Sequence, residues 1–145
     1  MAELHLILGV AGMVLNLIAA VWGAVLWFAR RHSIRFWYAV RVAQGSVILQ
    51  VLFGAVLLLA GREAKDAIHY MYGAAPLLIN FFAEGMRIGA AQREVGGRDF
   101  RSLDSGEQRQ IGLRIVRRET GIMAAACLLI VAFSVRAAQV SGKMF

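Results

Sequence analysis

The chain has 145 residues, 59% of them hydrophobic, with a mean hydropathy of +0.63 and a formal net charge of +7. This apolar fraction is too high for an ordinary soluble domain of this length, so the sequence predicts an integral membrane protein. The single cysteine, Cys127, excludes an intrachain disulfide and a cysteine-based zinc site. We expect one domain that spans residues 1–145.

Four apolar runs are each long enough to cross a bilayer, which takes about 20 residues. They cover residues 4–29, 38–60, 67–90 and 120–140. We therefore expect an all-α fold, an integral membrane four-helix bundle. The first run has no basic segment before it and no small-residue cleavage site, so we expect it to be retained as a helix.

The positive charge is concentrated on one side of the predicted bundle. Of the 16 Lys and Arg residues, four surround the first connection and eight flank or fill the predicted loop 91–119. These are Arg30, Arg31, Arg35 and Arg41, followed by Arg87, Arg93, Arg98, Arg101, Arg109, Arg114, Arg117 and Arg118. Because cytoplasmic loops carry the excess of basic residues, we expect both termini outside a bacterial-type inner (plasma) membrane. The charge then reflects topology and contact with membrane lipids, and we expect no nucleic-acid partner.

A stripe of small and polar residues in the first run recurs in the third. His5, Gly9 and Asn16 have the same spacing as His69, Gly73 and Asn80. We infer an internal repeat, a duplicated helix pair whose first members run parallel. The two histidines would then lie at matching depth near the outer surface. We also expect Asn16 and Asn80 to hydrogen-bond to each other across the bundle.

The run 67–90 carries further polar residues on the same edge as His69. At about 100° per residue, Asn80, Glu84 and Arg87 fall on the histidine side of the helix. Polar groups are costly in hydrocarbon, so this edge should face protein or a bound cofactor.

Glu84 and Arg87 are spaced for a mutual ion pair, and further charged residues lie at the same end of the predicted bundle. Their possible partners are Arg41, Arg117 and Glu119. We favour a structural ion-pair cluster that joins helices; the alternative is an entry point for protons or anions.

The long loop 91–119 contains a second helix signal. Ser105 followed by Gln108 is typical of a capping box. We expect a helix to begin there, to present Ile111, Ile115 and Val116 to the membrane surface, and to continue into the last run.

The two histidines are the residues that best indicate chemistry. A porphyrin held between two helices needs an axial nitrogen from each helix. Its flat face also needs space over the next helical turn, which glycine provides. His5 with Gly9 and His69 with Gly73 meet this requirement twice. The alternative is that each histidine is an interfacial hydrogen-bonding residue and each glycine a helix-packing notch.

Residues of the first three runs resemble one half of heme A synthase. The similar pieces are His5, the segment LQVLFGAVLLL at 49–59, a short outer loop, and the segment HYMYG that starts at His69. The resemblance implies a four-helix bundle that grips heme near the outer face, with His5 and His69 as axial ligands. Because the chain is long enough for only one of the family's two bundles, we expect a heme binder rather than a hydroxylase.

The sequence thus predicts a b-type, cytochrome b-like heme protein that serves electron transfer or heme handling. A respiratory complex or a second copy of the chain are its expected partners. Two other classes stay open: a small transporter or channel, which the repeat and the polar edge favour, and a structural or assembly subunit without a cofactor.

Overall fold

The computed structural model describes residues 2–62, 64 and 66–140 of the chain. Within these residues it contains four long helices, one short 3-10 helix and no strand. They are α1 (Ala2–Phe28), α2 (Ile34–Leu59), α3 (Ile68–Val95), η1 (Phe100–Ser102) and α4 (Ser105–Val140). The predicted all-α four-helix fold is confirmed.

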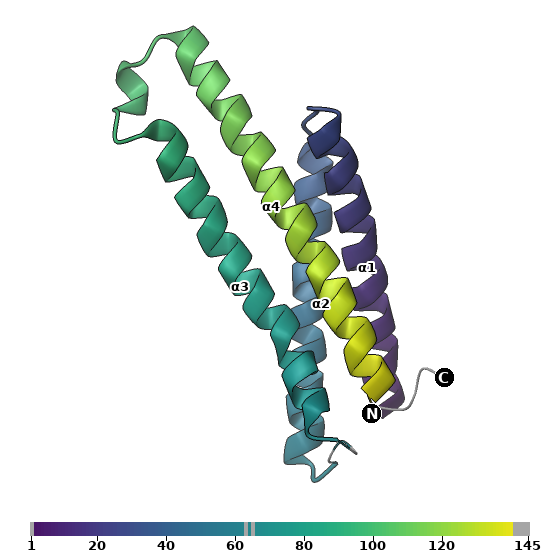
Figure 1. The fold of residues 1–145 in the computed structure, drawn as a ribbon. Coiled ribbons are helices and arrows are strands. Elements are labelled where there is room, and N and C mark those ends of the chain that lie inside the picture. Colours follow the sequence, from purple (N-terminus) through teal and green to yellow (C-terminus); the bar gives the residue numbers. More distant parts are fainter. Residues whose placement is uncertain (1, 63, 65, 141–145) are drawn as a thin grey trace.

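The helices form an antiparallel bundle in which α4 lies between α1 and α3 (Figure 1). The helix α2 packs on α1 and contacts α3 only sparsely. We call the end where α1 begins and α4 ends the terminal end, and the opposite end the hairpin end. At the hairpin end, α3, η1 and α4 extend past the α1–α2 connection (Figure 1). There Glu94 of α3 forms ion pairs with Arg114 and Arg118 of α4, at 3.0 and 2.8 Å.

Within the part of the chain that the structure describes, three helices are long and apolar enough to cross a membrane, namely Glu3–Phe28, Ile34–Leu59 and Ser105–Val140. The sequence predicts a fourth such span in residues 67–90. The helix α3 is long enough, at about 42 Å against a hydrocarbon core of about 30 Å, but its polar residues lower its mean hydropathy. Those residues face inward as expected: Asn80 is buried, whereas Phe81 and Phe82 are 75% and 65% exposed.

The predicted loop 91–119 is mostly helical. The helix α3 continues to Val95 and ends at Gly96, whose left-handed backbone (φ +64°) suits glycine. The predicted start of a helix at Ser105 is confirmed, but its cap is Asp104. The Oδ1 atom of Asp104 accepts hydrogen bonds from the backbone N–H groups of Gly106 and Glu107, at 2.7 and 2.9 Å.

One residue of this segment faces the other way from the expected direction. Ile111 is only 2% exposed, so the prediction that it faces the membrane surface is wrong. It lies on the side of α4 that is covered by protein, while the neighbouring Leu113 is 44% exposed.

The densest packing lies in the half of the bundle nearer the hairpin end. Ala19, Phe36, Val40, Met123 and Cys127 are fully buried there, on α1, α2 and α4. Gly23 of α1 allows this close approach, because a Cβ atom at that position would lie 2.7 Å from the Phe36 ring and 2.9 Å from the Cβ of Ala124. The terminal half is packed less tightly and contains a cavity.

Candidate functional site

The terminal half of the bundle contains a partly open cavity of about 1000 Å³ that all four helices line. Ligand sites in proteins commonly have volumes of about 300–1,000 Å³. Most of the lining is aliphatic or glycine. The polar side chains among the lining residues are His5, Ser46, Gln50, Arg62, His69, Tyr70, Tyr72 and Ser134. The cavity can therefore accept a large, mainly apolar molecule with a few polar contacts.

His5 of α1 and His69 of α3 both line this cavity, and their ring centres are 6.3 Å apart with the planes inclined by 66°. They come together because α1 and α3 run parallel and each carries its histidine in the first turns. Two metal–nitrogen bonds of about 2 Å, with about 1 Å more from each nitrogen to its ring centre, place two opposed imidazole ligands about 6 Å apart. The observed separation matches this value.

A backbone carbonyl fixes the ring of His69. Its Nδ1 atom lies 3.1 Å from the carbonyl oxygen of Ala137 on α4. Because a carbonyl oxygen can only accept, Nδ1 carries the proton in this contact and Nε2 keeps its lone pair. Histidines that bind metals commonly donate their second ring N–H to such an acceptor.

The ring of His5 is held between α1 and α2. Its Nε2 atom lies 3.3 Å from the side-chain nitrogen of Gln50. On the same helix, a Cβ atom at Gly54 would lie 3.2 Å from the His5 ring, so glycine leaves the space that the ring occupies. The two histidines thus differ: α4 orients His69, and α2 contacts His5.

The two glycines that were predicted to leave space for a porphyrin, Gly9 and Gly73, have different surroundings. Both Gly9 and Gly73 line the cavity. A Cβ atom at Gly73 would meet no atom within 4 Å, so this position faces open space as expected. At Gly9 a Cβ atom would lie 2.9 Å from the side-chain nitrogen of Gln50, so the Gln50 side chain occupies that space.

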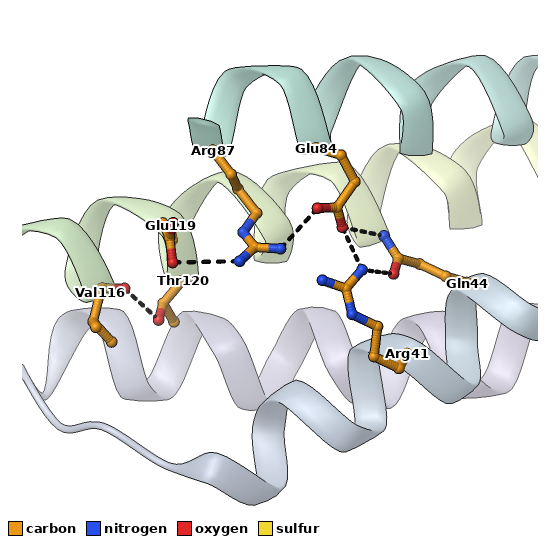
Figure 2. Close-up of polar contacts among 7 residues, drawn as sticks. All are labelled: Arg41, Gln44, Glu84, Arg87, Val116, Glu119 and Thr120. Atoms are coloured by element: carbon orange, nitrogen blue, oxygen red, sulfur yellow. Dashed lines mark hydrogen bonds and ion pairs between the residues drawn. The ribbon is translucent and has the colours of Figure 1, made fainter. Parts of the chain in front are cut away.

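A second polar cluster, shown in Figure 2, centres on Glu84 of α3. Its Oε1 atom accepts hydrogen bonds from Arg41 and Gln44 of α2, at 2.6 and 2.8 Å. Its Oε2 atom accepts from Arg87 at 2.7 Å, and Arg87 also lies 3.5 Å from Glu119 of α4. The predicted ion-pair cluster is confirmed, and it joins α2, α3 and α4.

Aromatic rings hold two arginines near this cluster. The guanidinium of Arg87 lies 4.5 Å from the centre of the Trp37 ring, in a cation–π contact. Arg117, one of the possible partners of Glu84, instead lies over Trp27 at 5.4 Å. The cluster thus brings together four charges of balanced sign and a stacked ring from α2, α3 and α4.

The predicted hydrogen bond between Asn16 and Asn80 is absent. The side-chain nitrogen of Asn16 donates instead to the carbonyl of Gly12 on its own helix, at 2.8 Å. The amide nitrogen and oxygen of Asn80 are buried and have no hydrogen-bond partner among the described residues. Equal positions in a repeat place two residues at the same depth, but they do not fix the distance between the helices that carry them.

The sequence interpretation gave no role to Gln44 and Gln50, which contact Glu84 and His5. A signal was present, because amide side chains inside an apolar run seldom face lipid. The contact of His69 with Ala137 has no such signal, since every residue carries a carbonyl.

No group of three or more His, Cys, Asp or Glu side chains in the described ranges is placed to hold a metal ion. A site with two axial histidines needs only the pair described above. In comparisons with known proteins, no family model, curated protein or solved structure matches the chain.

Proposed function

We propose that this chain is a membrane-embedded b-type heme-binding protein, ligated by His5 and His69, that serves electron transfer or heme handling. The observation that carries the proposal is the pair of imidazole rings, 6.3 Å apart at the edge of a cavity of about 1000 Å³. That separation suits one metal ion between two nitrogens.

Three further features support heme as the occupant. The mainly aliphatic lining suits a flat macrocycle. His69 presents Nε2 because Nδ1 is held by Ala137. Gly73 leaves open space one turn further along α3. On α1, ligation through Nε2 of His5 replaces the contact of that atom with Gln50.

The arrangement favours electron transfer over hydroxylation. When bound, a heme with two axial histidines supplies a reversible one-electron couple. If heme binds, His5 and His69 would both hold its iron, which would leave no position on the iron for a further ligand. The role of the polypeptide is then to fix the two rings, to surround the macrocycle with aliphatic side chains, and to exclude water.

The distribution of arginines along the bundle indicates which of its ends faces the cytoplasm. Arginines gather at the hairpin end, so we place that end in the cytoplasm of a bacterial-type cell and the terminal end outside. The cavity then lies in the outer half of the bilayer. Exposed apolar side chains such as Phe81 and Phe82 contact lipid. A redox partner, such as a respiratory complex or a second copy of the chain, would approach from the membrane or its outer surface.

The test is a hemin titration of the purified protein in lipid nanodiscs. We expect a sharp Soret band and, after reduction, the split visible bands of a low-spin bis-histidine heme. His5→Ala and His69→Ala should each remove the low-spin spectrum. His32→Ala, at an exposed position between α1 and α2, is the matched control and should leave it unchanged. Wild-type protein that stays colourless, or variants that keep the low-spin spectrum, would refute the proposal.

A further inference from the structure

One end of the cavity carries a positively charged side chain, Arg62, that has no role in the proposed binding of iron. Among the described residues that line the cavity, Arg62 is the only one with a charged side chain, and none is Asp or Glu. Arg62 follows α2, and its backbone N–H donates to the carbonyl of Leu57 at 3.0 Å. Its guanidinium forms no hydrogen bond or ion pair with any described residue, whereas Arg41, Arg87, Arg114 and Arg118 are all paired.

Tyr70 brings a second donor to the same rim. Its hydroxyl oxygen accepts a hydrogen bond from the backbone N–H of Ala64 at 2.8 Å, which ties the α2–α3 turn to the start of α3. The ring of Tyr70 lies beside that of His69, with the ring centres 6.2 Å apart. A hydroxyl that accepts one hydrogen bond still has its own proton to donate. Arg62 and Tyr70 thus offer donors at the rim next to His69.

The opposite end of the cavity differs in character. It is lined by Gly12, Met13, Ser46, Val47 and Pro76, none of which is charged, and the hydroxyl of Ser46 donates to the carbonyl of Ala43 on its own helix. A ligand that fills the cavity therefore meets a mainly apolar, uncharged surface at the deep end and N–H and O–H donors at the terminal end. This gradient suits an amphipathic molecule whose acid group points toward the membrane surface.

We infer that Arg62 and Tyr70 form a subsite for a carboxylate, and that the cavity selects an amphipathic acid bound with its acid group at the terminal end. This inference rests on the proposed function, in which the acid is a porphyrin and the carboxylates are its two propionates. A guanidinium pairs with a carboxylate through two parallel N–H···O bonds, which fixes orientation as well as affinity.

The inference is tested with metal-free protoporphyrin IX and its dimethyl ester, followed by porphyrin fluorescence in nanodiscs. Neither probe contains iron, so their binding does not depend on His5 or His69 as ligands. The ester removes both carboxylates and keeps the macrocycle. Wild-type protein should bind the acid more tightly than the ester by roughly 10- to 100-fold, the range expected for hydrogen bonds to a charged group.

Arg62→Gln should weaken binding of the acid by roughly tenfold or more and leave binding of the ester unchanged. Tyr70→Phe should show the same selectivity with a smaller loss. The matched control is Arg136→Gln, which removes one positive charge at the same end of the bundle, from a side chain that contacts Gln139 and does not line the cavity. It should change neither affinity.

Equal affinities of the wild type for acid and ester would overturn the inference, and so would an Arg62→Gln variant that loses both equally or neither. These outcomes are distinct from failure of the proposed function, which shows in hemin spectra that do not respond to His5→Ala or His69→Ala. If the protein binds the acid more tightly than the ester through Arg62 but forms no low-spin heme, the carboxylate subsite is supported and the assignment of His5 and His69 as iron ligands is wrong.

Discussion

The Nδ1 atom of His69 on α3 lies 3.1 Å from the carbonyl oxygen of Ala137 on α4. A ring carried by one helix is therefore oriented by the backbone of its neighbour, and its other nitrogen takes no part in this contact. This contact makes His69 the better defined of the two proposed ligands and leads to a prediction that needs no heme.

In the protein without heme, we expect His69 to be in the Nδ1–H tautomer at neutral pH. The reason is that the Ala137 carbonyl can only accept a hydrogen bond. Side-chain ¹⁵N shifts of histidine-labelled protein would measure the tautomer, with His69→Ala to assign the signal. A dominant Nε2–H tautomer would contradict the hydrogen bond with Ala137.

Gly73→Leu should block the cavity without unfolding the protein. The added side chain enters open space beside His69, and leucine is a better helix former than glycine. We expect hemin affinity to fall by at least about tenfold, or about 1.4 kcal/mol, with no loss of thermal stability. Titration and a melting curve measure the two effects.

Gly85→Leu is the matched control for this change. Gly85 lies on the same helix, a Cβ atom there would also meet no atom within 4 Å, and the residue does not line the cavity. Its hemin affinity should equal that of the wild type. If Gly73→Leu binds hemin as the wild type does, the ligand does not occupy the space beside α3.

Glu84→Gln should destabilise the bundle and leave the absorption spectrum of bound heme unchanged. The substitution removes the carboxylate that Arg41, Gln44 and Arg87 share, and none of these residues lines the cavity. We expect a loss of about 1–3 kcal/mol, because the group is partly exposed and its bonds are charge-assisted. Unfolding in a graded denaturing detergent would measure it.

Glu107→Gln, an exposed position near the start of α4, is the control and should change stability little. If Glu84→Gln is as stable as this control, the cluster is not the tie between α2, α3 and α4 that its contacts indicate. In that case the alternative role, an entry point for protons or anions, would gain weight.

Gly23→Ala should destabilise the protein through overpacking. The added methyl would lie 2.7 Å from the ring of Phe36, which is fully buried and has little room to move. We expect a cost of about 1–3 kcal/mol. Gly45→Ala, where a Cβ atom meets nothing within 4 Å, should instead be neutral or slightly stabilising. A melting comparison that ranks the two variants the other way would contradict the packing of α1 on α2.

By itself, the sequence determined the number and type of the helices, because apolar runs of this length have few other stable forms. It also predicted the parallel arrangement of α1 and α3 and the meeting of His5 with His69, since both helices start at the same end. The ion pairs of Glu84 and Arg87 followed from spacing on one helix edge.

Only the tertiary structure decided which groups touch across helices. The spacing of residues along a helix gives the depth of each side chain in the bundle and the side of the helix on which it lies, but not its distance from the next helix. Asn16 and Asn80 therefore occupy matching positions without a hydrogen bond between them. For the same reason, spacing did not show that the amide of Gln50 covers Gly9. Asp104 rather than Ser105 caps α4 because the cap depends on local backbone geometry. The orientation of His69 depends on a backbone carbonyl, a group that every residue shares, and only the packing of α3 on α4 selects the one at Ala137.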